Sequence, residues 1–158
     1  MVDFSNIKEN LWVVSLVAGI IGVITLFIPA WGWTSGGSWS IVWLWNLYIN
    51  DGNPNFIDLD EPLFAIGIVS TLIIAIGAVL LLFGGVFTKI KDREINLLYL
   101  IGGILTIVGI ITFIAGAAGV YGGFWTIYYI NVAGILPFIA GGLGIAAGVF
   151  GIIEKRKE

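Results

Sequence analysis

The run LFAIGIVSTLIIAIGAVLLLFGGVF, residues 63–87, decides the class of this protein. It contains no charged residue, and at 1.5 Å per helical residue it is long enough to cross a hydrocarbon core of about 30 Å. Three more runs share these properties: Leu11–Ala30, Leu97–Val120 and Val132–Ile153. All four lack strict β-alternation and exceed the length of a barrel strand. The sequence therefore predicts an all-α membrane protein with four spans, at about 11–30, 63–87, 97–120 and 132–153.

The composition supports this class. The 158 residues are 59% hydrophobic and 11% charged, whereas a soluble domain carries about a quarter charged residues. The chain also has no cysteine and no histidine. Their absence removes disulfides, thiol catalysis and the commonest ligands of zinc, copper, haem and iron–sulfur clusters. No catalytic constellation is evident either, so we expect a protein that is not an enzyme and that carries no cofactor.

The positive charges predict how the chain is oriented. They are confined to Lys8, to the segment Lys89–Arg93 and to Lys155–Lys157, while residues 31–62 and 119–131 contain no Lys or Arg. By the positive-inside rule, both termini and an inner loop at 88–96 are cytoplasmic, and 31–62 and 119–131 are outer loops. We expect one membrane domain, 1–158, in the cell membrane. Its acidic outer side argues against nucleic acid as a partner.

Two aromatic segments resemble each other. GGSWSIVWLWN at 36–46 is similar to GGFWTIYYIN at 122–131, and GVFTKIKDRE at 85–94 is similar to GVFGIIEKRKE at 148–158. Their common order suggests that a two-helix hairpin was duplicated, with halves 1–94 and 95–158. The alternative is chance similarity in a chain of low complexity. Both halves would have the same orientation, unlike the inverted repeats of many transporters.

Small residues recur at helical spacing within three of the spans. They are Gly19 and Gly22, Gly102 and Gly109, and Ala140, Gly144 and Gly148. Such residues let helix backbones approach closely in lipid. They predict either packing inside the bundle or a face for dimerisation. The spans contain no Asp, Glu, Lys or Arg, which argues against a pump or coupled transporter but leaves a passive pathway open.

The outer loops concentrate aromatic residues, since every tryptophan except Trp12 lies there. From Trp39 to Asn50, apolar and polar residues alternate as in a half-buried strand, although a helix in the membrane interface also fits. If strands form, Phe124–Ile130 could pair with them as a small sheet that caps the bundle. The candidate interaction residues are Trp31, Trp39, Trp43, Leu44, Trp45, Trp125, Tyr128 and Tyr129. The alternative is a belt at headgroup depth.

The four spans, the larger first outer loop and the segment ending in Leu44–Trp45 resemble the claudin-like tetraspan group. Trp31, Trp39, Leu44 and Trp45 are the positions that match its W…LW motif. The resemblance implies a small sheet in the first outer loop and a role in adhesion, in barriers or as an accessory subunit. The chain departs from the group because the cysteine pair after the motif is missing, the spacing within the motif differs and the first loop is short.

The stretch DGNPNFIDLDE, residues 51–61, is a weak calcium candidate. Its possible ligands are Asp51, Asn53, Asn55, Asp58, Asp60 and Glu61. It lacks the glycine at the sixth position and the glutamate at the twelfth that an EF-hand loop requires. The alternative is a turn followed by acidic residues and Pro62 at the start of a helix, where both are favoured.

These observations favour a non-enzymatic membrane protein that works by contact. Its partners would be the lipid bilayer and either a second copy of itself or another membrane protein. One alternative is an accessory subunit of a larger membrane complex. Another is a passive pore or a carrier of small molecules.

Overall fold

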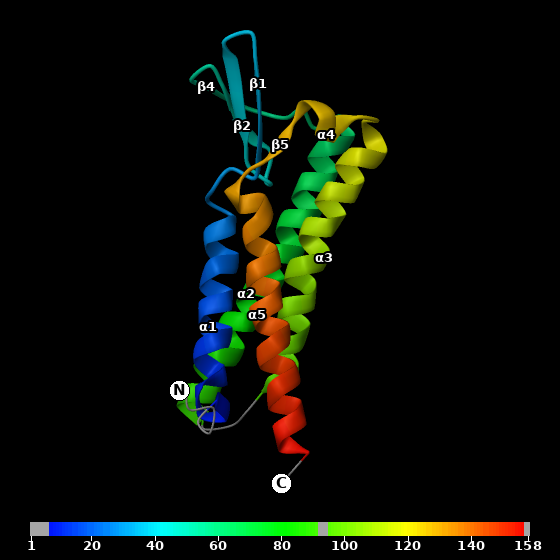
Figure 1. The fold of residues 1–158 in the computed structure, drawn as a ribbon. Helices are drawn as coiled ribbons and strands as arrows, with labels where there is room; N and C mark the ends of the chain where they lie inside the picture. Colours follow the sequence, from blue (N-terminus) through cyan, green and yellow to red (C-terminus); the bar gives the residue numbers. More distant parts are fainter. Residues whose placement is uncertain (1–6, 92–94, 157–158) are drawn as a thin grey trace.

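The computed structural model describes residues 7–91 and 95–156 as a bundle of helices with a small antiparallel sheet at one end (Figure 1). The long helices are α1 (Ile7–Thr25), α2 (Pro62–Lys91), α3 (Asn96–Val120) and α5 (Val132–Lys155), and α4 (Phe124–Ile127) is a single turn. The strands are β1 (Trp31–Ser35), β2 (Ser38–Val42), β3 (Leu47–Asn50), β4 (Asn53–Phe56) and β5 (Tyr129–Ile130).

The long helices form a ring in which each packs against two neighbours. Helices α1 and α3 both contact α2 and α5, whereas the diagonal pairs barely touch. The beginning of α1 and the end of α5 lie at the end of the bundle opposite the sheet (Figure 1). Among the described residues, α2, α3 and α5 are long and apolar enough to cross a membrane, and α1 contains a shorter apolar segment, Asn10–Thr25. The predicted membrane class is therefore supported by three helices.

Two predicted boundaries are wrong. Helix α1 ends at Thr25, not at Ala30, because Pro29 has no N–H and disfavours helical backbone at the residue before it. Ala30 already donates its N–H to Val42 O, at 2.8 Å, where the sheet begins. Helix α2 continues to Lys91 and takes up the first part of the predicted inner loop 88–96. Residues 92–94 of the predicted loop lie outside the described residues, and so does Lys157.

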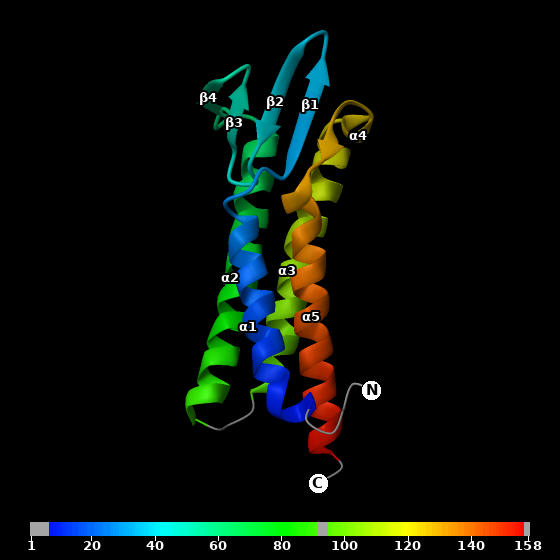
Figure 2. The ribbon, with the colours of Figure 1, turned by 60° about the vertical axis from the view of Figure 1, so that its left-hand side comes forward.

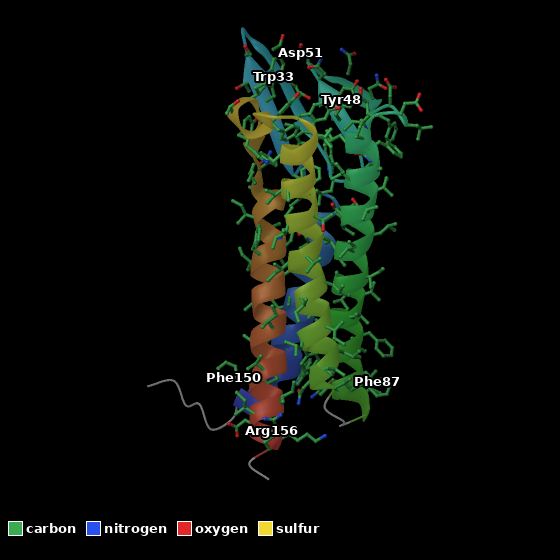
Figure 3. All side chains as sticks on the ribbon, turned by 90° about the vertical axis from the view of Figure 1, so that its right-hand side faces the viewer. Trp33, Tyr48, Asp51, Phe87, Phe150 and Arg156 are labelled. Carbon is green, nitrogen blue, oxygen red and sulfur yellow. The ribbon has the colours of Figure 1, made fainter. Side chains whose placement is uncertain are left out.

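The small residues that the sequence analysis singled out are all used inside the bundle. Ala140 is buried, and added Cβ atoms at the glycines would collide with the neighbouring helices: α2 for Gly19, Gly22, Gly102 and Gly109, and α3 for Gly144 and Gly148. Of the two interpretations, internal packing is therefore the one that the contacts support, and these residues are not free to form a dimerisation face. The outside of the helices carries aliphatic and aromatic side chains such as Phe150 (Figure 3).

A close backbone contact joins α3 to α5. A Cβ atom at Gly103 would lie 2.6 Å from Gly141 O and 2.7 Å from Ile145 N. Both are backbone atoms, so no side-chain rotation can relieve the collision. Between the neighbouring helices α1 and α2, Ser15 donates a hydrogen bond of 2.8 Å to Leu81 O.

We therefore expect Gly103→Ala to lower the free energy of unfolding by about 1–3 kcal/mol, because overpacking forces the two backbones apart. Gly142→Ala is the matched control, since Gly142 is an exposed residue of α5 whose added Cβ would meet nothing within 4 Å. The control should be neutral or slightly stabilising, as is usual for alanine in place of a helical glycine. Reversible unfolding in mixed micelles measures both, and equal stabilities of the two variants would contradict the close α3–α5 contact.

Candidate functional site at the sheet end

The described strands form a sheet in the order β4-β3-β2-β1-β5, with every pair antiparallel (Figure 2). The sequence analysis predicted strand character for residues 39–50 and allowed an interfacial helix; the strand is confirmed and the helix is wrong. The single predicted strand is interrupted, however, by a turn at 43–46. The expected pairing of Phe124–Ile130 is wrong in part, because only Tyr129 and Ile130 pair with β1. The residues before them form α4, which follows Gly123 at a φ of 80°.

The register separates the sheet into two chemically different faces. One face carries Trp31, Trp33, Ser40, Val42, Tyr48 and Asn50, which are cross-strand partners of one another. The other face carries a row of partners that crosses all strands: Tyr129, Gly32, Ile41, Ile49 and Pro54. The Tyr129 ring lies over Gly32, where an added Cβ would be 2.7 Å from the tyrosine oxygen. Apart from the Tyr129 hydroxyl this row is apolar from edge to edge, and the same face also carries Thr34, the partner of Trp39.

The turn Trp43–Asn46 attaches the sheet to the helices. The Trp43 indole N–H donates to Phe27 O at 2.9 Å and the Trp45 indole N–H donates to Leu26 O at 2.7 Å. These carbonyls directly follow α1, where backbone acceptors lack helical partners. Asn46 has a left-handed φ of 72° and donates its side-chain N–H to Phe64 O in α2 at 2.8 Å. The turn therefore links the end of α1 to the start of α2.

A second attachment is the buried ring of Trp31. It is 3% exposed, and its centroid lies 5.4 Å from that of Phe113, 4.7 Å from that of Phe124 and 5.2 Å from that of Tyr128. Leu44 is similarly buried, at 1% exposed. The expectation that Trp31 and Leu44 belong to an interaction surface is therefore wrong, because both are core residues that join the sheet to the bundle.

The other predicted interaction residues occupy three settings. Trp43 and Trp45 are half-buried and are held by the bonds described above. Trp125 and Tyr128 are half-buried on the helical side, where the Trp125 indole donates to Ile114 O at 3.2 Å and Tyr128 stacks on Phe124. Trp39 and Tyr129 are 41% and 45% exposed. Among the predicted interaction residues, the exposed pair therefore lies on the strands.

A cleft of about 800 Å³ separates the first sheet face from the segment that joins α3 to β5. Aromatic rings line both walls: Trp31, Trp33 and Tyr48 from the sheet, and Tyr121, Phe124 and Tyr128 from the helical side. Figure 3 marks Trp33 and Tyr48 at this end of the molecule. The sequence analysis did not assign Trp33, Tyr48, Tyr121 or Phe124 to a site, although their common location in the outer loops was an available signal.

Glu61 and Tyr121 meet at the cleft. The Tyr121 hydroxyl donates a short hydrogen bond to Glu61 Oε2, which links the residue before α2 to the residue after α3. This hydrogen bond, followed by partial burial and the charge of the carboxylate, raises the pKa of Tyr121 above its ordinary value. The phenol therefore stays protonated at neutral pH and remains a donor to the carboxylate.

The residues of the calcium candidate are divided among separate contacts. Asp51 accepts the backbone N–H of Trp39 at 2.8 Å, the Asn55 side chain accepts the N–H of Phe56, and Glu61 is bound to Tyr121. Over the described residues, no group of three or more acidic side chains converges as a metal site would require. The turn interpretation therefore explains this stretch better than a calcium loop.

The indole bonds of the turn can be tested by a substitution that retains the ring. Trp45→Phe removes the donor to Leu26 O and should lower the free energy of unfolding by about 1 kcal/mol, the usual net contribution of a hydrogen bond. Trp39→Phe removes an exposed indole and should change stability by less than about 0.5 kcal/mol. Reversible unfolding measures both variants, and a larger loss for Trp39→Phe would contradict the proposed anchor.

The pKa of Tyr121 gives a second test. Its protonated form is the one that donates to Glu61, so this contribution to stability is complete below pH 10 and is lost as pH rises through the elevated pKa. Absorbance titration of the phenolate, taken as the difference between the unsubstituted protein and Tyr121→Phe, should give a midpoint above 10. Glu61→Gln should move that midpoint down; an unchanged midpoint would assign the elevation to another cause.

No protein-family model matches the chain, and no curated protein matches it. Two features of the sheet end offer recognisable chemistry: an uncharged apolar sheet face and, on the opposite side of the same strands, an aromatic cleft with one carboxylate.

Proposed function

We propose that this is a non-enzymatic integral membrane protein that works by contact, with the apolar face of its sheet packing against a second copy of the chain. The observation that carries the proposal is the row Tyr129–Gly32–Ile41–Ile49–Pro54, which is apolar in every strand. Tyr129 and Pro54 at its two ends are exposed, and Ile41 and Ile49 are half-buried. Exposed apolar area is costly in water and marks interaction surfaces.

A second copy is the partner that best fits this face. Among the described strands, the residues on this face carry no charge, so two such faces can approach without repulsion. The membrane would also hold two bundles parallel and at the same depth, which places their sheets at the same height. The contact would be isologous, with the same patch contributed by each copy.

The proposed orientation puts the sheet outside the cell and both termini in the cytoplasm, with four spans. The charges support this arrangement, because Lys89, Lys155 and Arg156 lie at the end away from the sheet and satisfy the positive-inside rule. The acidic residues of 51–61 lie at the sheet end. In this arrangement α1 is the fourth span, with Trp43 and Trp45 at headgroup depth beside its final turn.

We also propose a relationship to the claudin-like group. The support comes from the sheet of the first outer loop and from the matched residues, since Trp31 and Leu44 are core residues of that sheet and Trp45 anchors it. The missing cysteine pair remains a departure. A pore through the bundle is less well supported, because the fully buried Leu81 side chain of α2 reaches across the ring to Gly144 of α5, where an added Cβ would lie 2.6 Å from it.

A charge placed on the apolar face should prevent the contact. We expect the unsubstituted protein, extracted gently from its membrane, to give a discrete homo-oligomer in native mass spectrometry, and Ile49→Lys to give the monomer, because the lysine would be desolvated in the interface. Asn53→Lys is the matched control, since it adds the same charge to the opposite face of the same sheet. It should leave the particle mass unchanged.

Two outcomes would contradict the proposal: a monomer in the absence of substitution, or an oligomer that survives Ile49→Lys. If a larger unrelated membrane protein copurifies and is lost on Ile49→Lys, the same face binds another protein and the chain is an accessory subunit.

A further inference from the structure

We infer that the cleft between the sheet and α4 is a binding site for an organic cation that has an apolar body. This inference goes beyond the proposed contact, because the cleft lies on the opposite face of the sheet. The volume of about 800 Å³ is within the range of small-molecule sites. Its walls come from four segments of the chain, three of which are held together by the Trp31 and Glu61–Tyr121 contacts.

The first argument is the chemistry of the walls. Aromatic residues of both sides line the cleft. Trp33, Tyr48, Tyr121 and Tyr128 are half-buried or exposed, whereas Trp31 and Phe124 are buried and their rings pack against each other. Aromatic faces attract cations through their quadrupoles, most strongly where water is excluded. They also provide apolar area for the uncharged part of a ligand.

The second argument is the charge. Glu61 lines the cleft, and its carboxylate has acceptor capacity beyond the bond from Tyr121. No Lys or Arg occurs between residues 9 and 88 or between 94 and 154, so no cation of the chain itself is available from the sheet or from α4 to neutralise it. The local field therefore favours a positive ligand and opposes an anion.

The third argument is an unused donor. The indole N–H of Trp31 is buried and has no hydrogen-bond partner within the described residues, and the Trp31 ring lines the cleft. A buried donor without a partner is unfavourable, so a site that contains one favours a ligand with an acceptor. Since the cation is recognised by Glu61 and the rings, the complement to Trp31 is an uncharged oxygen, such as a hydroxyl or ether.

The probe for this site is benzyl(2-hydroxyethyl)dimethylammonium, which combines a cation, a ring and a hydroxyl. Its comparison compound is 3,3-dimethyl-4-phenylbutan-1-ol, in which carbon replaces the charged nitrogen. Calorimetric titration measures the affinity of both compounds for the protein in uncharged maltoside micelles. Empty micelles are the blank. We expect the cation to bind about 10-fold more tightly than the neutral isostere, the ratio typical of a partly desolvated cation–π site.

Glu61→Gln should weaken binding of the cation about 5-fold and leave the neutral isostere within about 2-fold, because one close charge is removed while the shape is retained. Asp58→Asn is the matched control: it removes the same charge from an exposed residue that does not line the cleft. It should change the affinity for the cation by less than about 2-fold. Trp33→Leu provides a second test if Glu61→Gln does not fold. This variant should weaken binding of the cation more than binding of the neutral isostere.

Equal affinities for the two compounds would overturn the inference, as would the absence of binding by either. An equal effect of Asp58→Asn and Glu61→Gln on the affinity for the cation would also overturn the inference. The preference for the cation would then come from the general acidity of the sheet end. The result is independent of the proposed contact, because Ile49→Lys alters the opposite face and should leave the affinity for the cation unchanged.

Discussion

The backbone carbonyls of Leu26 and Phe27 need donors at the point where α1 ends, and the indoles of Trp45 and Trp43 supply them. In the interior of a helix these acceptors would be bonded by the following turn, but Pro29 ends the helix here. Tryptophan satisfies a carbonyl without placing a charge near lipid, and its ring covers the apolar end of the helix. Because Asn46 binds α2 from the same turn, these few bonds and the buried Trp31 ring together hold the sheet on the bundle.

The tilt of the sheet determines what each of its faces can do. With Trp31 held against Phe113 and Phe124, one face is directed toward the helical segment that closes the cleft. The other face is directed away from it, and the Tyr129 side chain, lying over Gly32, covers part of it. Two opposite surfaces with different chemistry therefore arise from one short sheet. The feature common to both is the absence of basic residues, which leaves aromatic, aliphatic and acidic groups to define them.

The helices could be predicted because long uncharged runs have few alternatives in lipid, and the parity of Trp39, Ile41 and Ile49 correctly placed these residues on one face. The break at Trp43–Asn46 could not be predicted, since it depends on bonds to residues far away in the sequence. The glycine spacing predicted close helix contacts. It could not indicate whether the contacting helix belonged to the same bundle or to a second copy of the chain. For Glu61, proximity to a helix start suggested a local role, whereas its partner is Tyr121, 60 residues away.

The early end of α1 also bears on the surrounding lipid. The uncharged helical part of α1 runs from Leu11 to Thr25, while α2 remains uncharged from Leu63 to Thr88, so their apolar lengths differ by roughly 15 Å at 1.5 Å per residue. A bilayer that meets helices of unequal length must thin beside the shorter one, or the longer one must tilt. In the proposed four-span arrangement, such a mismatch favours gathering the deformed edges of separate molecules, so the lipid itself would promote association along α1.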